Sequence, residues 1–184
     1  MIRCKAALQK PAKNGRPVTW TFCRLPKQAS AKLPSRGQVT VKGSINDAGF
    51  TATLEPDGEG GHWLKVTRKL REAAEANVGD AIALQFAPVP PEEEPEPSVP
   101  ADLRKALASD FPGSAKAREV WKDITPVARR DWIAWIVSAK QAATRERRIN
   151  NACDMLSKGK RRPCCFDRSG MYSKSITCPA AEPS

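Results

Sequence analysis

The feature that most constrains the fold is a block of proline and glutamate that divides the chain. Residues 88–100, PVPPEEEPEPSVP, contain six prolines, four glutamates and no basic residue. Proline removes a backbone donor and favours extended backbone, while neighbouring glutamates repel one another. Such a block predicts a semi-rigid, exposed linker between two separate domains. The alternative is a tether that folds over a basic surface and competes there with anionic ligands.

Residues 1–87, before the linker, alternate apolar and polar side chains with the period of a β-strand. Asn46–Gly49 and Asp57–Gly61 have the composition of hairpin turns. Six short strands in this segment predict a small barrel, because closure removes exposed sheet edges. Short helices are expected near residues 27–33 and 69–76. The strands are expected around residues 2–8, 18–22, 39–45, 50–54, 62–66 and 82–86.

Residues after the linker repeat their apolar side chains with the period of an α-helix instead. Thr125 suits a helix N-cap and Pro126 the first helical position, so a helix is expected to begin there. A break near residues 139–144 is expected to split the run that follows into two packed helices, and Gly159 is expected to end the second. Two further helices are expected over residues 101–109 and 114–122.

The predicted fold class is therefore β + α in two domains, a small split β-barrel followed by a small helical domain. A chain of 184 residues is long enough to give such domains a core. The predicted segments are a barrel domain at 1–87, a Pro/Glu linker at 88–100, a helical domain at 101–160 and an irregular, cysteine-containing tail at 161–184.

The formal charge of +11 is shared by both halves of the chain. Residues 1–87 hold 14 basic and 7 acidic residues, and residues 101–184 hold 17 basic and 9 acidic residues. A basic surface attracts polyanions without revealing their identity. No apolar run is long enough to cross a bilayer, and the N-terminal residues lack the apolar stretch of a signal peptide. We therefore expect a cytoplasmic protein with no membrane insertion and an unknown anionic partner or protein partner.

Several motifs resemble two bacterial families. WTFCRLP at 20–26, VKGSIN at 41–46 and VGD at 78–80 resemble a domain family of unknown function, similar in fold to the AbrB-like swapped-hairpin barrels. Arg129-Arg130 with Trp132-Ile133, and TRERRI at 144–149, resemble the bacteriocin-protection, YdeI/OmpD-associated family. This resemblance covers about residues 2–160 and implies no catalytic residues. It implies a link to tolerance of envelope-targeting peptides, and a barrel that either closes alone or pairs as a homodimer.

A basic stripe is expected along the last helical run, opposite its apolar face. Such a stripe either grips phosphate or carboxylate groups through arginine forks, or is a solvated face with structural ion pairs. Arg145 either adds to the stripe or pairs with an acidic residue of the helical domain. The residues of the stripe are Lys140, Thr144, Arg147, Arg148 and Asn151.

Trp132 and Trp135 precede the basic stripe in the same run. Exposed tryptophans can stack on bases, as in single-strand binders. Here both lie on the same side as Ile136 and Ala139, so core packing is the favoured interpretation. This removes the aromatic half of the argument for a nucleic-acid-binding helix.

Cys164 and Cys165 are the candidate redox thiols, because the neighbouring cations at 160–162 are expected to lower a thiol pKa. The alternative is free thiols without a role. A zinc site is disfavoured, since structural zinc prefers cysteine pairs two to four residues apart. The four C-terminal cysteines are instead separated by 10, 0 and 12 residues.

Three classes of function remain after these observations. The first is a non-enzymatic binding protein of stress or bacteriocin and cationic-peptide tolerance, as the resemblance implies. The second is a non-sequence-specific nucleic-acid-binding or AbrB-like regulatory protein. An enzyme is the least supported class, because His62 is the only histidine and no cofactor motif is present. We therefore expect no catalytic residues, no cofactor and no metal.

Overall fold

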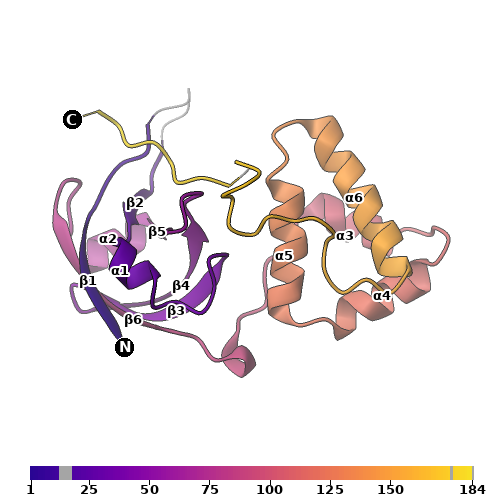
Figure 1. The fold of residues 1–184 in the computed structure, drawn as a ribbon, viewed down its shortest axis with the longest axis horizontal. Coiled ribbons are helices and arrows are strands. Elements are labelled where there is room, and N and C mark those ends of the chain that lie inside the picture. Colours follow the sequence, from indigo (N-terminus) through magenta and orange to yellow (C-terminus); the bar gives the residue numbers. More distant parts are fainter. Residues whose placement is uncertain (13–17, 175, 184) are drawn as a thin grey trace. The chain divides into compact units, whose positions relative to one another are not determined.

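The chain divides into two compact units, as seen in a computed structural model that describes residues 1–12, 18–174 and 176–183 (Figure 1). One unit contains Met1–Pro91 together with Asp167–Ser184, and the other contains Glu92–Phe166. The first unit is a nearly closed six-stranded antiparallel barrel, and the second is helical. The predicted fold class, a small β-barrel followed by a small helical domain, is confirmed.

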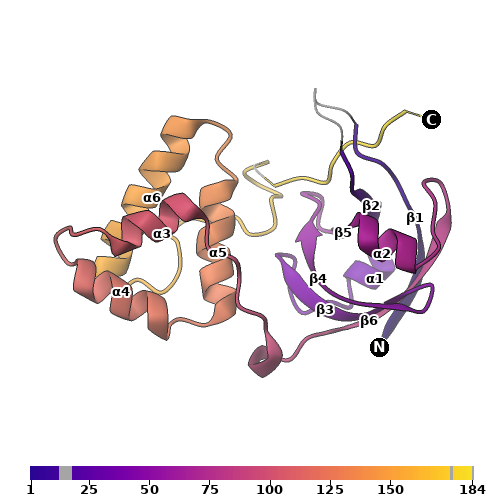
Figure 2. The ribbon, with the colours of Figure 1, turned by 180° about the vertical axis from the view of Figure 1, so that it is seen from behind.

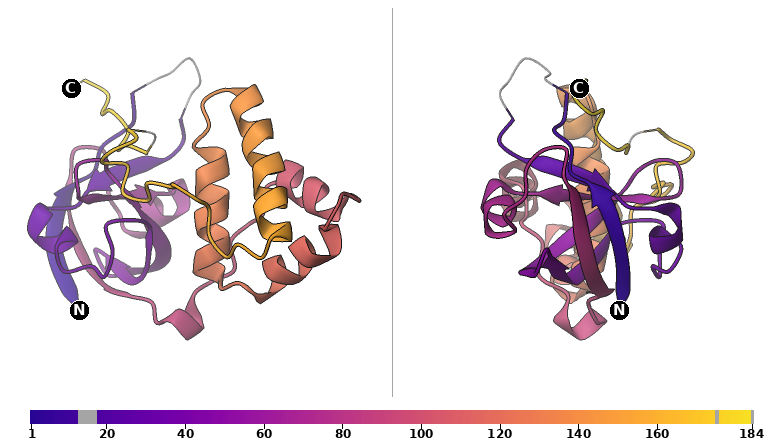
Figure 3. Two further views of the ribbon diagram at one scale, coloured as in Figure 1. Left: turned by 45° about the vertical axis from the view of Figure 1, so that its right-hand side comes forward. Right: turned by 90° about the vertical axis from the view of Figure 1, so that its left-hand side faces the viewer.

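The barrel strands are ordered β1-β6-β3-β4-β5-β2, and each neighbouring pair is antiparallel. A bridge between Gln9 and Phe22 continues the first strand toward the second and nearly closes the barrel (Figure 3). The strands are β1 (Ile2–Ala7), β2 (Thr21–Arg24), β3 (Val39–Ile45), β4 (Ala48–Pro56), β5 (His62–Val66) and β6 (Ala81–Pro88).

The period-two alternation explains which strand residues enter the barrel core. Ile82, Leu84 and Phe86 of β6 are buried, while Ala81 before them and Ala83 between the first two face outward. Two short helices, α1 (Lys27–Ser30) and α2 (Arg68–Ala73), accompany the strands, and both are shorter than the sequence predicts.

A two-residue turn joins β3 to β4. Asn46 and Asp47 adopt φ values of +43° and +69°, which asparagine and aspartate tolerate better than most residues. The Asn46 side chain accepts a hydrogen bond from the Ala83 N–H at 2.9 Å, so the turn is also tied to β6. The predicted hairpin turn at this position is confirmed.

The loop between β4 and β5 is held by one buried carboxylate. Asp57 Oδ1 accepts hydrogen bonds from the N–H groups of Glu59 and Gly61, both at 2.8 Å. His62 follows at the start of β5 with its side chain fully buried, and its Nε2 lies 2.9 Å from the Gly37 carbonyl oxygen. Burial lowers the pKa of His62. The loop is the predicted hairpin turn, and His62 is a structural residue of the strand end.

The helical unit is built around α6 (Ala142–Ser157), which packs against the other three helices of the unit (Figures 2 and 3). Those helices are α3 (Ala101–Ala108), α4 (Ser114–Asp123) and α5 (Pro126–Val137), and a 3-10 turn, η1 (Pro91–Glu93), precedes them. Thr125 caps α5 by accepting a hydrogen bond from the Ala128 N–H at 3.3 Å. The predicted start of α5 and the predicted break before α6 are both confirmed.

The tail returns to the barrel instead of staying with the helices. The N–H of Ala12 donates to the Ala180 carbonyl at 2.8 Å, and the N–H of Glu182 donates to the Lys10 carbonyl at the same distance. Cys178 donates from its N–H to the Asp57 carbonyl at 3.2 Å. Residues of the tail thus form an added extended segment of the barrel unit, which the period of the sequence does not reveal.

Asp167 organises the start of that returning segment. Its carboxylate accepts hydrogen bonds from the N–H groups of Tyr172 at 2.8 Å and Ser173 at 2.9 Å, and from the Ser169 hydroxyl at 2.7 Å. Partial burial would raise the pKa of Asp167, but these donors outweigh it and hold the pKa well below its usual range. The carboxylate therefore stabilises the turn above the ordinary aspartate pKa, and this stabilisation is lost as the pH falls below it.

Candidate functional site

Arg145 of the predicted anion-binding set is occupied by a carboxylate within the helical unit. Its Nε lies 2.6 Å from Asp102 Oδ2, and its terminal nitrogen lies 3.0 Å from Asp102 Oδ1. This two-point contact joins α6 to α3, and the hydrogen bond from Arg145 lowers the pKa of Asp102. Of the two roles expected for Arg145, the structure shows the internal ion pair.

Arg148 is turned toward the end of α5. Its guanidinium donates to the Trp135 carbonyl and, at 2.9 Å, to the Ser138 hydroxyl. The same guanidinium lies 5.5 Å from the centre of the Trp135 ring. An arginine in this position satisfies carbonyl groups that the end of a helix leaves unpaired. Arg148 therefore joins α6 to the last turn of α5.

Lys140 and Arg147 remain the exposed cations of the predicted stripe. Within the described residues neither has a hydrogen-bond or ion-pair partner. Lys140 lies before the first residue of α6, so the prediction that it shares a helix with Arg147 is wrong. The reason is local, since the loop between α5 and α6 extends to Gln141. The helical stripe is thus reduced to two separated cations.

The tryptophans that precede the stripe belong to the helical core. The Trp132 side chain is fully buried, and Trp135 is half-buried with its ring packed edge to face on Trp132 at 6.0 Å. The favoured prediction of core packing is confirmed.

The linker glutamates contact the helical unit. Glu94 pairs with Arg130, and Glu96 pairs with Arg129. The Glu94 side chain is only 7% exposed, which departs from the expectation of a fully solvated linker. The linker has the contacts expected of the alternative, a tether that folds over a basic surface. Its carboxylates occupy the arginine pair that the family motif contributes.

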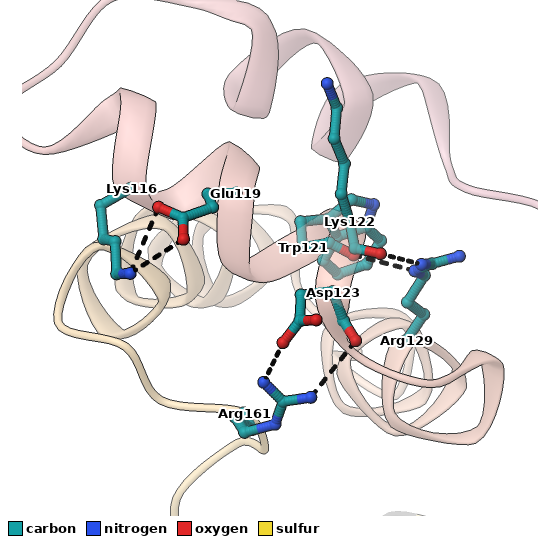
Figure 4. Close-up of polar contacts among 7 residues, drawn as sticks. All are labelled: Lys116, Glu119, Trp121, Lys122, Asp123, Arg129 and Arg161. Atoms are coloured by element: carbon teal, nitrogen blue, oxygen red, sulfur yellow. Dashed lines mark hydrogen bonds and ion pairs between the residues drawn. The ribbon is translucent and has the colours of Figure 1, made fainter.

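Arginines also hold the end of α4 (Figure 4). Arg129 donates to the carbonyl groups of Trp121 at 2.9 Å and Lys122 at 2.8 Å. Arg161 pairs with the Asp123 carboxylate and donates to its carbonyl oxygen at 3.2 Å. Cations at a helix C-terminus satisfy free carbonyl groups and complement the helix dipole. These arginines are therefore structural.

The outer face of the barrel carries cations of a different kind. Arg3 and Lys5 of β1 line a hollow of about 400 Å³ together with Ser44, Ala83 and Gln85. Arg3 donates to Gln85 Oε1 at 3.0 Å, so two of the lining side chains contact each other. Asn46 and Asp47 also line the hollow, so one carboxylate is among its lining groups.

Lys42 extends this basic face along β3. It is exposed and lies two residues before Ser44, hence on the same side of the strand. Within the described residues, Lys5 and Lys42 have no hydrogen-bond or ion-pair partner. Sequence reasoning missed these cations, although the alternation that places Ile2 and Ala6 inside also places Arg3 and Lys5 outside. We call Arg3, Lys5 and Lys42 the basic face of the barrel.

A cluster of aromatic side chains lies near β2 and β5. The rings of Trp20 and Trp63 are stacked with centres 6.2 Å apart, and Phe22 contacts both edge to face. Lys65 Nζ lies 4.9 Å from the centre of the Trp20 ring. Trp20 and Trp63 are half-buried, so part of each ring is open to solvent.

The two candidate redox thiols lie together on an exposed segment. The Sγ atoms of Cys164 and Cys165 are 3.2 Å apart, and both side chains are exposed. The hydrogen bond with Cys164 raises the pKa of the Cys165 thiol. Two of the three neighbouring cations are themselves paired, Arg161 with Asp123 and Arg162 with Asp131. The prediction that these cations lower the thiol pKa is wrong for Cys165.

The described residues contain no group of three or more histidine, cysteine, aspartate or glutamate side chains placed to hold a metal ion. None of the helices formed by these residues is both long enough and apolar enough to cross a membrane.

Two protein-family models match the chain. The model described as "Domain of unknown function (DUF1905)" matches residues 5–86, which lie in the barrel unit. The model described as "Bacteriocin-protection, YdeI or OmpD-Associated" matches residues 96–159, which lie in the helical unit. The curated proteins contain no match to the chain. The barrel half of the chain therefore belongs to the domain family of unknown function, and the helical half belongs to the bacteriocin-protection, YdeI or OmpD-associated family.

Proposed function

We propose that this protein is a non-enzymatic binding protein that uses the basic face of its barrel to hold an anionic ligand. The observation that carries the proposal is the hollow beside Arg3 and Lys5, with Lys42 on the same face. Its lining includes hydrogen-bond donors beside the single carboxylate of Asp47, and Lys5 and Lys42 are not neutralised by partners within the described residues. Ligands with phosphate or carboxylate groups fit this chemistry.

The arginines of the helical unit are less suited to bind an anion than the lysines of the barrel. In its described residues, five arginines already pair with carboxylates, and a sixth, Arg148, is held by a carbonyl and a hydroxyl. These contacts neutralise most of the arginines that join its helices. The five pairs are Arg129–Glu96, Arg130–Glu94, Arg145–Asp102, Arg161–Asp123 and Arg162–Asp131.

A polyanion titration tests the basic face. We expect the full chain to bind inorganic polyphosphate with an affinity that falls steeply as salt is added. Replacing Lys5 and Lys42 together with alanine should weaken binding about tenfold at low salt and flatten the salt dependence. The matched control replaces Lys32 and Lys69, which are exposed lysines elsewhere on the barrel. If both double variants lose the same affinity for polyphosphate, the effect comes from net charge alone and the proposed site is wrong.

A single-stranded nucleic acid is the second candidate ligand. Stacked, half-buried Trp20 and Trp63 with Lys65 beside them provide the aromatic and cationic groups on which exposed bases stack. In the same titration, a short oligothymidylate that binds far more tightly than polyphosphate, and that loses this advantage in Trp20→Ala, would favour this candidate. Equal binding of both polymers would favour the general anion.

The family name suggests the physiological context, tolerance of bacteriocins or other cationic peptides. We expect deletion of the gene to lower the peptide concentration that stops growth, and the intact gene to restore it. The Lys5→Ala, Lys42→Ala variant should restore less tolerance than the Lys32→Ala, Lys69→Ala control. If deletion leaves peptide sensitivity unchanged, the tolerance role is wrong, whatever the titration shows.

A further inference from the structure

Cys164 and Cys165 lie on a short segment between two locally ordered stretches. Before the pair, Arg161 and Arg162 are held by the carboxylates of Asp123 and Asp131. After it, Asp167 is held by the hydrogen bonds of its own turn. The two exposed Sγ atoms lie 3.2 Å apart, so they are presented to solvent together.

We propose that Cys164 and Cys165 form a reversible thiol-modification site, which a small-molecule disulfide converts into a disulfide between these two neighbours. The Cys164 thiolate attacks one sulfur of the small disulfide, forms a mixed disulfide and releases one small thiolate. Cys165 then loses its proton to solvent and attacks the Cys164 sulfur, which releases the second small thiolate. Two protein thiols are oxidised, and one small disulfide is reduced to two thiols.

The order of attack follows from the contact between the two thiols. Cys164 is the first attacker of the pair, because the hydrogen bond with Cys164 raises the pKa of the Cys165 thiol and makes Cys165 the poorer source of thiolate. The other cysteines compete poorly. Cys23 and Cys153 are buried, and burial raises the pKa of half-buried Cys4 and Cys178.

A bond between sequence neighbours is also easily reversed. The Cα atoms of consecutive residues lie about 3.8 Å apart across a trans peptide. Ordinary disulfides join Cα atoms about 4.4 to 6.8 Å apart, so closure between neighbours stores strain. Strained, exposed disulfides have higher reduction potentials and are the ones that cells reduce readily. The pair is therefore suited to reversible oxidation and not to a permanent structural disulfide.

The test treats the full chain with oxidised glutathione and maps its peptides by mass spectrometry without reduction. Wild-type protein should give one peptide that carries both cysteines and has lost two hydrogens, and reduced glutathione should reverse this. Cys165→Ser should stop at the mixed disulfide on Cys164, since the second attacker is gone. Cys164→Ser should react about tenfold more slowly.

Cys178→Ser is the matched control and should behave as the wild type, and circular dichroism should show that all variants are folded. A wild-type protein that accumulates glutathione on Cys164 without closing would overturn the proposal. So would modification of Cys4 or Cys178 ahead of the pair.

Discussion

Replacing Trp132 with alanine is expected to destabilise the helical unit strongly while the stability of the barrel unit is unchanged. The Trp132 side chain is fully buried among Leu103, Ile136 and Leu156 of the same core. Removing a buried tryptophan costs about 3–5 kcal/mol, because the transfer free energy is lost and a cavity remains. A unit of this size has a free energy of unfolding of only about 4–11 kcal/mol. Urea titration should therefore show a helical transition at much lower urea.

Trp132→Phe is the matched control for this prediction. Within the described residues the Trp132 indole N–H has no acceptor, so phenylalanine removes volume without removing a hydrogen bond. We expect this variant to lose only about 1 kcal/mol. Circular dichroism measures the helical transition, and amide resonances of barrel residues report the other unit. An alanine variant that unfolds at the wild-type urea concentration would refute the assignment of Trp132 to the core.

Replacing Gly43 with alanine is expected to destabilise the barrel by about 3 kcal/mol, because the new methyl group overpacks the interface between β3 and β6. A Cβ atom at position 43 would lie 2.0 Å from the Gln85 carbonyl oxygen and 2.6 Å from the Phe86 Cα atom. Both are backbone atoms of β6, so no side-chain rotation relieves the clash. The strands must separate, and the ladder between Gly43 and Phe86 must weaken.

The neighbouring strand supplies the control. Gly49 lies on β4, and a Cβ atom built there meets nothing within 4 Å. Gly49→Ala should therefore leave stability unchanged or raise it by up to about 1 kcal/mol, since alanine restricts the unfolded chain. Thermal unfolding of the two variants side by side measures the difference. Similar melting temperatures would mean that β6 does not approach Gly43 as closely as described.

The fold was predictable where the signal is local. The alternation of apolar and polar residues from Ile2 to Phe86 predicted the strands. Thr125 and Pro126 predicted the start of α5. The requirement at Gly43 was not predictable in this way, because the atom that excludes a side chain belongs to Gln85, far along the chain. The return of the tail to the barrel was not predictable for the same reason, because Ala12 and Ala180 are far apart in sequence and contact each other only in the folded chain.

The candidate site was less predictable than the fold. Counting charges along a helix suggested a stripe, but Asp102 lies far from Arg145 in sequence and still neutralises it. Only the folded structure shows which cations are exposed and have no acidic partner among the described residues. Lys5 and Lys42 are such cations, and they come from strands whose outward positions carry no apolar pattern to draw attention.

The barrel unit is assembled from both ends of the chain, and this has a consequence for synthesis. Residues 1–91 leave the ribosome before the helices, but residues 167–183 follow after them. Domains fold as they emerge, N-terminal first. Pro179–Ala181, which line the hollow beside Phe22, are therefore synthesised only after the whole helical unit. Until then, the backbone groups of Lys10 and Ala12 that pair with the tail are accessible to chaperones and to other nascent chains.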